Sequence, residues 1–331
     1  MYHASLPHLI GIFVTNKCNL KCRHCCVSAG QSSKEELSYD EIISILDFCA
    51  EHQIFCIDIT GGEPLLREDI MDILRYGTDK GLRMSLASNG LLISKKTVSD
   101  LASIKIWRVR ISLDGLKFNH EWLRGKNTFE QTVRAIKMLS DAGISTKISM
   151  VVHRRNINEI EQVGNLARSL GVYEVRLLPF VPIGRGKKIR KIMLTPKQWK
   201  DLMSKLDEIS NRVKVPICID SPLEGLLKGK GYLNPCVCGY LYLGISSNGD
   251  AFPCPIMTDV KIGNIRKESI VEIWNSDVIK NLRDASQLKG ACASCTYKMR
   301  CNGGCRALAY YIKGDYTCPD PFCWIASQKK C

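Results

Sequence analysis

The sequence contains no apolar run of about 18 residues, the length needed to cross a lipid bilayer, so we expect no membrane-spanning helix. It also lacks a secretion signal, because the N-terminal stretch MYHASLPHLIGIFVTNKC has no basic segment, only a short apolar run and no small-residue cleavage site. No short internal repeat or low-complexity tract occurs along the 331 residues. These absences predict a globular protein that stays in the cytoplasm.

Acidic residues are also in deficit, since 33 Asp and Glu stand against 47 Lys and Arg, which gives a net charge of +14. Such an excess suggests an anionic partner, such as nucleic acid, an acidic peptide or a polycarboxylate. The densest basic run is GRGKKIRK at residues 184–191, which is equally typical of a solvated loop. No nucleic-acid-binding fold signature accompanies it, so we do not expect nucleic acid as the partner.

Cysteine is abundant, with 17 residues in the chain. A secreted disulfide scaffold is one interpretation, but such scaffolds are usually short and loop-rich, whereas this chain has long helical patterns. In a reducing compartment, clustered thiols are more often metal ligands or catalytic groups. The cysteines gather between Cys18 and Cys26 and again between Cys218 and Cys323. We therefore expect metal ligation.

Short β-rich runs alternate with amphipathic helical segments from residue 8 to about 180. Six strands are expected at residues 8–15, 55–60, 82–88, 104–112, 145–152 and 173–180. Helices are expected between them, and Gly81, Gly143 and Gly171 stand where three of these should end. This alternation predicts the α/β class, as a partial (β/α)6 barrel, because six units fall short of the eight of a complete barrel.

The chain is expected to divide into three parts. Residues 1–190 would form the barrel, residues 191–233 a helical connection, and residues 234–331 a small cysteine-rich domain. The connection contains a helix at 195–213, with Thr195 as its N-cap and Pro196 in its first turn. After about residue 234, regular periodicity fades and Cys, Gly and Pro become frequent, which is typical of a domain organised by metal.

The first cysteine motif is C-x3-C-x2-C, formed by Cys18, Cys22 and Cys25 in CNLKCRHC. Three thiolates from one short loop can hold three irons of a 4Fe–4S cube and leave the fourth iron open. Zinc is the main alternative, and it would need Cys26 or His24 as a fourth ligand.

Polar and glycine residues follow four successive predicted strands at the end where parallel β/α folds build their sites. The cysteine loop follows the first strand. The other candidates are Gly61, Gly62, Glu63 and Pro64 after the second strand, Ser88 and Asn89 after the third, and Ser112 and Asp114 after the fourth. The two glycines would let a ligand approach the backbone closely. The sequence therefore predicts a nucleotide pocket at this rim.

The motifs CNLKCRHC and TGGEPLLR together resemble the radical S-adenosylmethionine (SAM) superfamily, over roughly residues 8–185. The resemblance implies that SAM binds the open iron and, after one-electron reduction, is cleaved to methionine and a 5′-deoxyadenosyl radical that abstracts a substrate hydrogen. The GGEP backbone and Glu63 would contact the SAM amino group. Ser112 would contact its ribose or carboxylate and Arg124 its carboxylate; the alternatives are a strand-end hydroxyl and a surface arginine. A reducing protein such as ferredoxin or flavodoxin would supply the electron.

The C-terminal cysteines resemble the SPASM domain, an auxiliary-cluster module, over about residues 234–327. Cys238 is followed by ten residues, Gly249, four residues and Cys254, and then by a C-x2-C-x5-C-x3-C run that starts at Cys292 and ends at Cys305. Cys323 follows in DPFCW. The resemblance implies one or two auxiliary 4Fe–4S clusters, with a zinc ribbon as the alternative for the C-x2-C pair.

The same resemblance implies a ligand set for each auxiliary cluster. The first would be bound by Cys238, Cys254 and Cys305, with either Cys236 or an open iron in the fourth position. The second would be bound by Cys292, Cys295, Cys301 and Cys323, with Cys318 as the competitor of Cys323.

Three interpretations of the substrate follow. The segments GGCRALAY, GDY and DPFCW resemble the haem-pathway members of the SPASM group. This implies a tetrapyrrole whose propionates Arg and Lys would bind, with radical abstraction leading to decarboxylation or loss of a side chain.

The second interpretation is a peptide-modifying enzyme that makes thioether or carbon–carbon crosslinks. It would need a separate recognition protein, because the first strand starts near residue 8. The sulfatase-maturating branch fits less well, since Pro255 follows Cys254 where that branch has a catalytic aspartate. The third interpretation is a non-enzymatic iron–sulfur electron carrier or regulator. The GGEP turn and the nucleotide-pocket pattern argue against it, because electron transfer needs neither.

Overall fold

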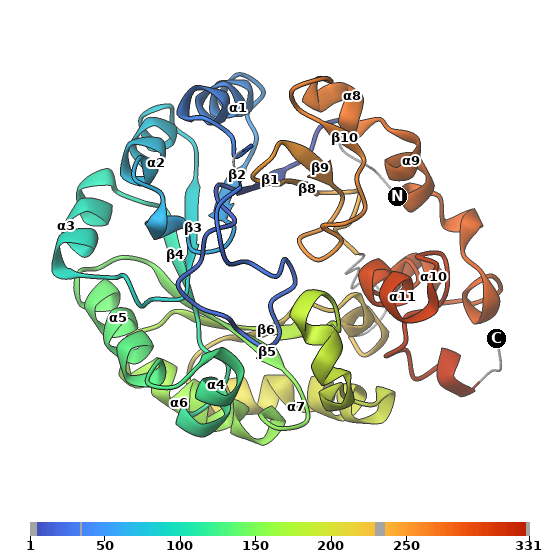
Figure 1. The fold of residues 1–331 in the computed structure, drawn as a ribbon. Helices are drawn as coiled ribbons and strands as arrows, with labels where there is room; N and C mark the ends of the chain where they lie inside the picture. Colours follow the sequence, from blue (N-terminus) through green and yellow to red (C-terminus); the bar gives the residue numbers. More distant parts are fainter. Residues whose placement is uncertain (1–4, 34, 229–235, 329–331) are drawn as a thin grey trace.

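The computed structural model describes residues 5–33, 35–228 and 236–328. Its central element is a curved ten-stranded sheet, ordered β10-β9-β8-β1-β2-β3-β4-β5-β6-β7, with helices around its outer side (Figure 1). The strands are β1 (Leu9–Phe13), β2 (Cys56–Thr60), β3 (Met84–Ser88), β4 (Arg108–Ser112), β5 (Thr146–Val152), β6 (Glu174–Pro179), β7 (Ile217–Ile219), β8 (Tyr242–Ile245), β9 (Asp250–Phe252) and β10 (Gly263–Asn264).

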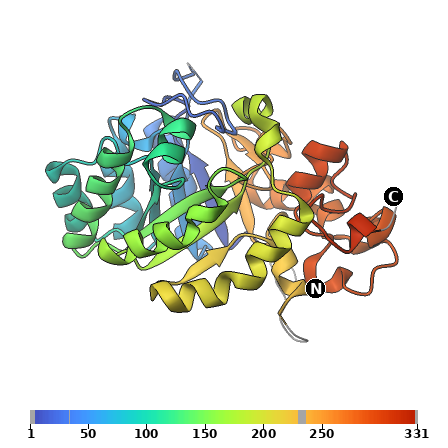
Figure 2. The same cartoon turned by 90° about the horizontal axis from the view of Figure 1, so that it is seen from below.

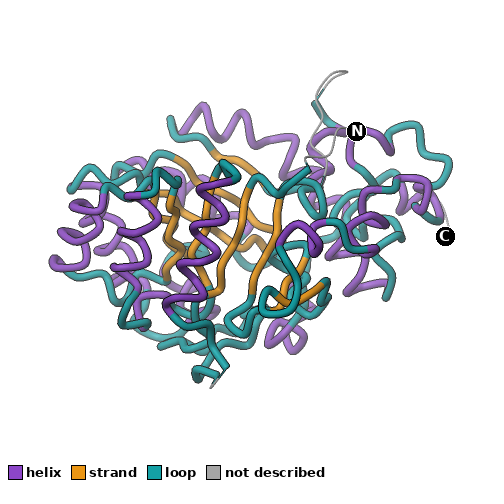
Figure 3. The backbone as a smooth tube through the Cα atoms, turned by 90° about the horizontal axis from the view of Figure 1, so that it is seen from above, coloured by secondary structure: helices purple, strands orange, loops and turns teal. Residues whose placement is uncertain are grey.

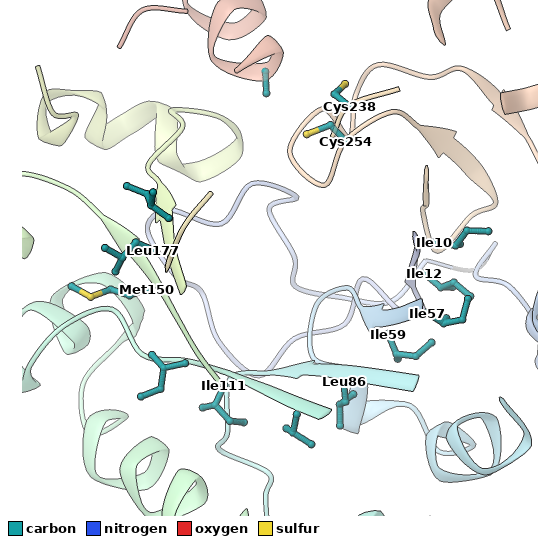
Figure 4. Close-up of a cluster of buried hydrophobic side chains, with 14 of the residues drawn as sticks. Ile10, Ile12, Ile57, Ile59, Leu86, Ile111, Met150, Leu177, Cys238 and Cys254 are labelled. Carbon is teal, nitrogen blue, oxygen red and sulfur yellow. The ribbon is translucent and has the colours of Figure 1, made fainter. Parts of the chain in front are cut away.

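The six predicted strands are confirmed as β1–β6, and they pair in parallel in sequence order, which confirms the α/β class and the partial barrel. Alternate side chains of these strands are apolar and fully buried in the main core, among them Ile57, Leu86, Ile111, Met150 and Leu177 (Figure 4). The intervening positions are more polar. This alternation lets the sheet pack against helices on one face while polar groups line the other.

The helices between the strands surround the sheet (Figures 1 and 2). They are α1 (Tyr39–Glu51), α2 (Ile70–Asp79), α3 (Lys95–Ile104), α4 (Lys117–Arg124), α5 (Phe129–Asp141), α6 (Ile160–Ser169) and α7 (Pro196–Val213). Thr195 caps α7 as predicted, in a capping box with Gln198 and with Pro196 in the first turn. Gly81, Gly143 and Gly171 follow α2, α5 and α6 with positive φ, as expected of residues that end helices.

The C-terminal part contributes strands to the same sheet. Strand β8 pairs in parallel with β1, and β9 pairs antiparallel with β8, so the sheet continues beyond the predicted barrel. Strand β7 lies within residues 191–233, which were predicted as a helical connection, and it pairs with β6. The predicted boundary between residues 233 and 234 falls outside the described residues.

Short helices complete this part of the chain. They are α8 (Ile270–Trp274), α9 (Asp277–Arg283), α10 (Lys298–Cys301) and α11 (Arg306–Lys313). They lie beyond β8–β10, with α8 beside α1 and with α10 and α11 nearer the C-terminus (Figure 1). Figure 3 shows the C-terminus at one end of the molecule, among helices and loops. No helix among the described residues is long and apolar enough to cross a membrane.

Candidate active site and metal-binding cysteines

The loop between β1 and α1 carries the first three predicted cysteine ligands. Its two ends are tied together, because the Cys18 amide donates to the Gly30 carbonyl (2.9 Å) and the Gly30 amide donates to the Asn16 carbonyl (2.9 Å). Backbone amides also face two of the sulfurs: Leu20 N lies 3.4 Å from Cys18 Sγ, and Ala29 N lies 3.4 Å from Cys25 Sγ. Amide donors of this kind stabilise sulfur that carries negative charge.

The electrostatics of this loop fit a metal cluster. Burial raises the pKa of Cys22 to about 11 and also raises that of Cys18, so these thiols lose their protons readily only when positive charge is brought to them. Cys25 lies close enough to both to affect their ionisation. Three soft sulfur donors on one loop suit an iron–sulfur cube with an open corner.

The zinc alternative would need a fourth ligand from this loop. The Nε2 atom of His24 instead faces Arg124 Nη2 (3.5 Å) and Asp114 Oδ2 (3.7 Å). Burial raises the pKa of Cys26 to about 12, and its thiol lies in electrostatic range of Cys254 as well as Cys25. These surroundings favour the iron–sulfur interpretation over a four-ligand zinc site.

The GGEP turn after β2 packs directly on this loop. The Gly62 amide donates to the Thr15 carbonyl (2.7 Å), and the Glu63 amide donates to the Lys17 carbonyl (2.8 Å). A Cβ on Gly61 would overlap the Thr15 carbonyl oxygen, and one on Gly62 would overlap that of Lys17. The glycines therefore allow close approach of the protein's own backbone, immediately before Cys18, rather than of a ligand alone.

The carboxylate of Glu63 connects this turn to the next strand. It is fully buried and accepts hydrogen bonds from Ser88 Oγ (2.8 Å), the Asn89 amide (2.8 Å) and the Leu65 amide (3.3 Å). Burial raises the pKa of Glu63 although these donors oppose the shift. The short helical segment Pro64–Leu66 follows directly. The structure thus brings Gly61, Gly62, Glu63, Pro64, Ser88 and Asn89 together beside the cysteine loop.

Asp114 and Arg124 form a buried ion pair behind the same loop. Arg124 Nε lies 2.5 Å from Asp114 Oδ2, and Arg124 Nη1 lies 4.0 Å from Cys22 Sγ. Burial raises the pKa of Asp114, but the neighbouring Arg124 and His24 lower it by more, so the pKa falls to about 2. The surface interpretation of Arg124 is wrong, since its side chain is only 10% exposed. Ser112 is half-buried at the end of β4, in register with Ser149 of β5.

Arg185 hydrogen-bonds to the backbone of the cysteine loop, a role that the sequence did not predict. Its Nε donates to the Cys22 carbonyl (2.8 Å), its Nη1 to the Ala29 carbonyl (2.7 Å), and its backbone amide to the Cys25 carbonyl (3.1 Å). A Cβ on Gly184 would overlap the Cys25 and Cys26 carbonyl oxygens. The segment Gly184–Ile192 (η3), yellow-green in Figures 1 and 2, therefore lies against the dark-blue loop.

Four of the C-terminal cysteines lie together near β8 and the start of α11. The Cys238 thiol hydrogen-bonds to Cys236, which lowers the pKa of Cys236, and Cys238 also interacts with Cys254. Figure 4 shows Cys238 and Cys254 side by side. Cys305, at the N-cap of α11, lies in range of Cys236 and Cys254. Cys236 thus lies with the three cysteines predicted to bind the first auxiliary cluster.

A second group of four contains Cys292, Cys295, Cys301 and Cys323. Burial, together with the charges of the other members of the group, raises the pKa of Cys292 to about 12 and that of Cys301 to about 11. The predicted competitor Cys318 lies in a turn, where its amide donates to the Asp315 carbonyl (3.2 Å), next to Lys289. This position favours Cys323 as the last ligand.

Two charged residues that were not predicted lie between these groups. Arg306 is 2% exposed, donates to the Tyr316 carbonyl (2.6 Å), and lies near enough to Cys236 and Cys292 to lower the pKa of each. Asp320 accepts from the Cys305 amide (2.7 Å), and burial raises its pKa to about 6. The segments GGCRALAY and DPFCW contain these two residues, but no spacing rule identifies them.

A cavity of about 380 Å³ lies between the cysteine loop and the C-terminal part. Its walls include Cys26 and Ser28 of the loop, Lys187 of η3, and Asp259 and Tyr311 of the C-terminal part. The Tyr311 hydroxyl donates to the Asp259 carboxylate and to the Ile256 carbonyl (3.2 Å). This volume falls in the range of roughly 300–1,000 Å³ usual for small-molecule sites. The cavity is thus reached from both cysteine-containing parts of the chain.

Comparison with known proteins identifies two family models along the chain. The model "Radical SAM superfamily" matches residues 12–167, and the SPASM model "Iron-sulfur cluster-binding domain" matches residues 236–296. An AdoMet-dependent heme synthase of Methanosarcina barkeri is 34% identical, over 98% of this chain and 98% of its own. A mycofactocin maturase of Mycolicibacterium smegmatis, MftC, is 33% identical over 94% of this chain and 81% of its own. In fold, the chain is similar to Streptococcus suis SuiB bound to the precursor peptide SuiA, with a TM-score of 0.81, 20% identity and coverage of 97% of this chain and 77% of that one.

Proposed function

The chain belongs to the radical SAM superfamily and carries a SPASM iron–sulfur domain, and we propose that this cytoplasmic enzyme modifies the side chains of a tetrapyrrole in a haem pathway. The family implies a SAM-binding 4Fe–4S cluster and auxiliary iron–sulfur clusters. When bound, the first cluster with SAM supplies a 5′-deoxyadenosyl radical that removes a hydrogen atom from the substrate. In this proposal, the side chains of the protein bind the clusters, SAM and the substrate.

In this proposal, Cys18, Cys22 and Cys25 hold the SAM-binding cluster. Glu63, which accepts three hydrogen bonds at the rim of the barrel, would bind the SAM amino group. Arg124, whose Nη groups face Cys22 and His24 of the same loop, would bind the SAM carboxylate. The hydroxyl of Ser112 would hydrogen-bond to the ribose or the carboxylate of SAM.

The two C-terminal groups of four cysteines hold the auxiliary clusters in this proposal. Cys236 completes the set of Cys238, Cys254 and Cys305, and Cys323 completes the set of Cys292, Cys295 and Cys301. Arg306 offsets the thiolate charge of both sets from a buried position. A reducing protein such as ferredoxin or flavodoxin delivers the electron for SAM cleavage.

The choice of a tetrapyrrole rests on one observation: the likeness to an AdoMet-dependent heme synthase extends over nearly the whole of both chains. The positive charge of the chain and the presence of Lys187 in the cavity wall agree with a substrate that carries carboxylates. Decarboxylation of a propionate would release CO₂ and one electron. Hydrogen abstraction leaves a side-chain radical, and loss of CO₂ together with one electron leaves a vinyl group. The step therefore needs a one-electron acceptor of the iron–sulfur class.

A peptide substrate is the second candidate, because a mycofactocin maturase is nearly as similar in sequence. The test is a direct comparison of the two substrate classes. Anaerobically reconstituted protein, reduced with dithionite, is incubated with SAM and an iron porphyrin that bears four propionates, and the porphyrin is analysed by mass spectrometry. The proposal expects 5′-deoxyadenosine together with stepwise loss of side-chain carboxyl groups. An unchanged porphyrin, together with crosslinking of a candidate peptide under the same conditions, would overturn it in favour of the second candidate.

A further inference from the structure

A second groove, of about 860 Å³, runs along η3 and is strongly basic. Five cations line it: Arg154, Lys187, Lys188, Arg190 and Lys191. All five are exposed, and no acidic side chain lines the groove. Within the described part of the chain, none of the five lies within 4.0 Å of a carboxylate.

Several arginines elsewhere in the described part of the chain are paired with carboxylates. Arg110 contacts Asp58 at 2.6 Å, Arg176 contacts Asp220 at 2.8 Å, and Arg212 contacts Glu161 at 2.9 Å. The groove differs from these sites, because five cations gather along η3 and none of them has a carboxylate partner among the described residues. Such a concentration attracts anions and raises their local concentration.

The groove also has an apolar side, contributed by Ile189, Ile192, Met193 and Leu194. The backbone beneath it is held in place, since the Arg154 amide donates to the Ile192 carbonyl at 2.9 Å and the Met193 amide donates to the Arg190 carbonyl at 3.2 Å. A small inorganic anion would make no use of the apolar side. An apolar molecule that carries several carboxylates at its edge would use both.

The groove adjoins the cavity beside the cysteine loop. Lys187 lines both spaces, and Arg185, two residues earlier, contacts the Cys22 and Ala29 carbonyls. A ligand anchored along η3 therefore extends naturally toward the cavity wall formed by Cys26 and Ser28.

We propose that the η3 groove binds the carboxylates of the substrate that are not reacting, and so presents one side chain of the substrate to the cavity beside the cysteine loop. The ligand class is an apolar macrocycle with several carboxylates at its edge. This assignment rests on the tetrapyrrole function proposed above and names the part of the protein that would recognise the substrate.

Binding can be measured apart from catalysis. The reconstituted full-length protein is titrated anaerobically, without SAM, with a fluorescent metal-free porphyrin bearing four propionates, and anisotropy gives the Kd. In the test variant, Lys188→Gln/Lys191→Gln, two groove charges are removed. In the matched control, Lys95→Gln/Lys205→Gln, two other exposed lysines, from α3 and α7, are changed, so the net charge falls by the same amount.

The proposal expects the groove variant to bind about tenfold more weakly than the parent, because two partly screened charge contacts with the carboxylates are lost. The control should stay within about twofold of the parent, and the porphyrin tetramethyl ester should bind both variants alike.

Equal weakening of the groove variant and the control would reduce the effect to net charge and overturn the groove assignment. Parent-like binding by the groove variant would overturn it too, while leaving the tetrapyrrole function in place. Failure of the parent to bind any carboxylated porphyrin would overturn both proposals.

Discussion

Arg185 Nε donates a hydrogen bond to the carbonyl oxygen of Cys22 at 2.8 Å, although the two residues are 163 positions apart in the chain. The same residue reaches the carbonyls of Cys25 and Ala29. One arginine after β6 thus holds the cysteine loop at three points, which are Cys22, Cys25 and Ala29. Hydrogen bonds from a charged donor to buried carbonyls are among the stronger contacts in proteins.

Replacement of Arg185 by glutamine should therefore disorganise the cysteine loop. We expect Arg185→Gln to lose most of the SAM-binding cluster, to keep the auxiliary clusters, and to cleave SAM at least about tenfold more slowly, from the loss of contacts of about 1.5–3 kcal/mol each. Iron analysis and EPR spectra of the reduced protein, with and without SAM, measure these effects. Arg134→Gln, an exposed residue of α5, is the control. A full SAM-dependent EPR change in Arg185→Gln would contradict this role.

The Asp114–Arg124 pair should matter for stability as well as for the site. Asp114→Asn leaves the guanidinium of Arg124 buried without its carboxylate, which should cost about 3–5 kcal/mol of unfolding free energy. The double variant Asp114→Asn/Arg124→Met should lose less, because it leaves no uncompensated charge. Urea denaturation under anaerobic conditions measures all three proteins. A single variant no less stable than the double variant would contradict the prediction.

The pH dependence of this pair follows from the lowered pKa of Asp114, about 2 against an ordinary value of 3.8. A lowered folded-state pKa contributes stability above the ordinary value and loses it as the pH falls toward 2. The stability gap between the parent and Asp114→Asn should therefore stay constant between roughly pH 6 and 9. A gap that closed within this window would show that another group controls the pair.

Gly62→Ala should disturb the cysteine loop through steric overlap alone. The added methyl group would meet the Lys17 carbonyl oxygen, and backbone cannot yield as a flexible side chain can. We expect weaker SAM binding and a loss of about 1–3 kcal/mol in stability, measured by calorimetry and thermal unfolding. Gly81→Ala is the comparison: its Cβ meets no atom within 4 Å, so only its positive φ costs stability. Equal SAM affinity in the two variants would argue against packing of the turn on the loop.

Cys323 and Cys318 offer a matched pair for the second auxiliary site. Cys323→Ser should lose about one cube's worth of iron, because its sulfur belongs to the buried group of Cys295 and Cys301. Cys318→Ser should keep the parent's iron content, since its turn faces Asp315 and Lys289. Iron and sulfide analysis distinguishes the two outcomes. Loss of iron from Cys318→Ser alone would reverse the assignment.

The barrel was predictable from sequence because each of its strands is long enough, and apolar enough, to stand out between amphipathic helices. Strand β7 has only three residues and gave no such signal. Strands β8–β10 lie among cysteines, glycines and prolines, where periodicity is weak, so their union with β1 could not be foreseen.

The rim of the site was predictable wherever a motif follows a strand, as Glu63, Ser88 and Asn89 do. The partners of isolated charges were not. Arg124 gave the same local signal as a surface arginine, and Arg185 stood in a run of basic residues that are otherwise exposed. Only the fold brings Arg185 to the cysteine loop, because such a contact depends on where β6 ends relative to β1. The identity of the cluster ligands and of the SAM contacts remains a prediction.

The pairing of β8 with β1 joins the C-terminal cysteines to the strand that leads into the first cysteine loop. A ladder of backbone hydrogen bonds thus fixes the separation of the two cysteine-containing parts of the chain. Electrons passing between clusters bound in these two parts should therefore cross the same distance throughout turnover. Removal of the C-terminal part would expose an unpaired edge of β1 and would not release two independently folded units.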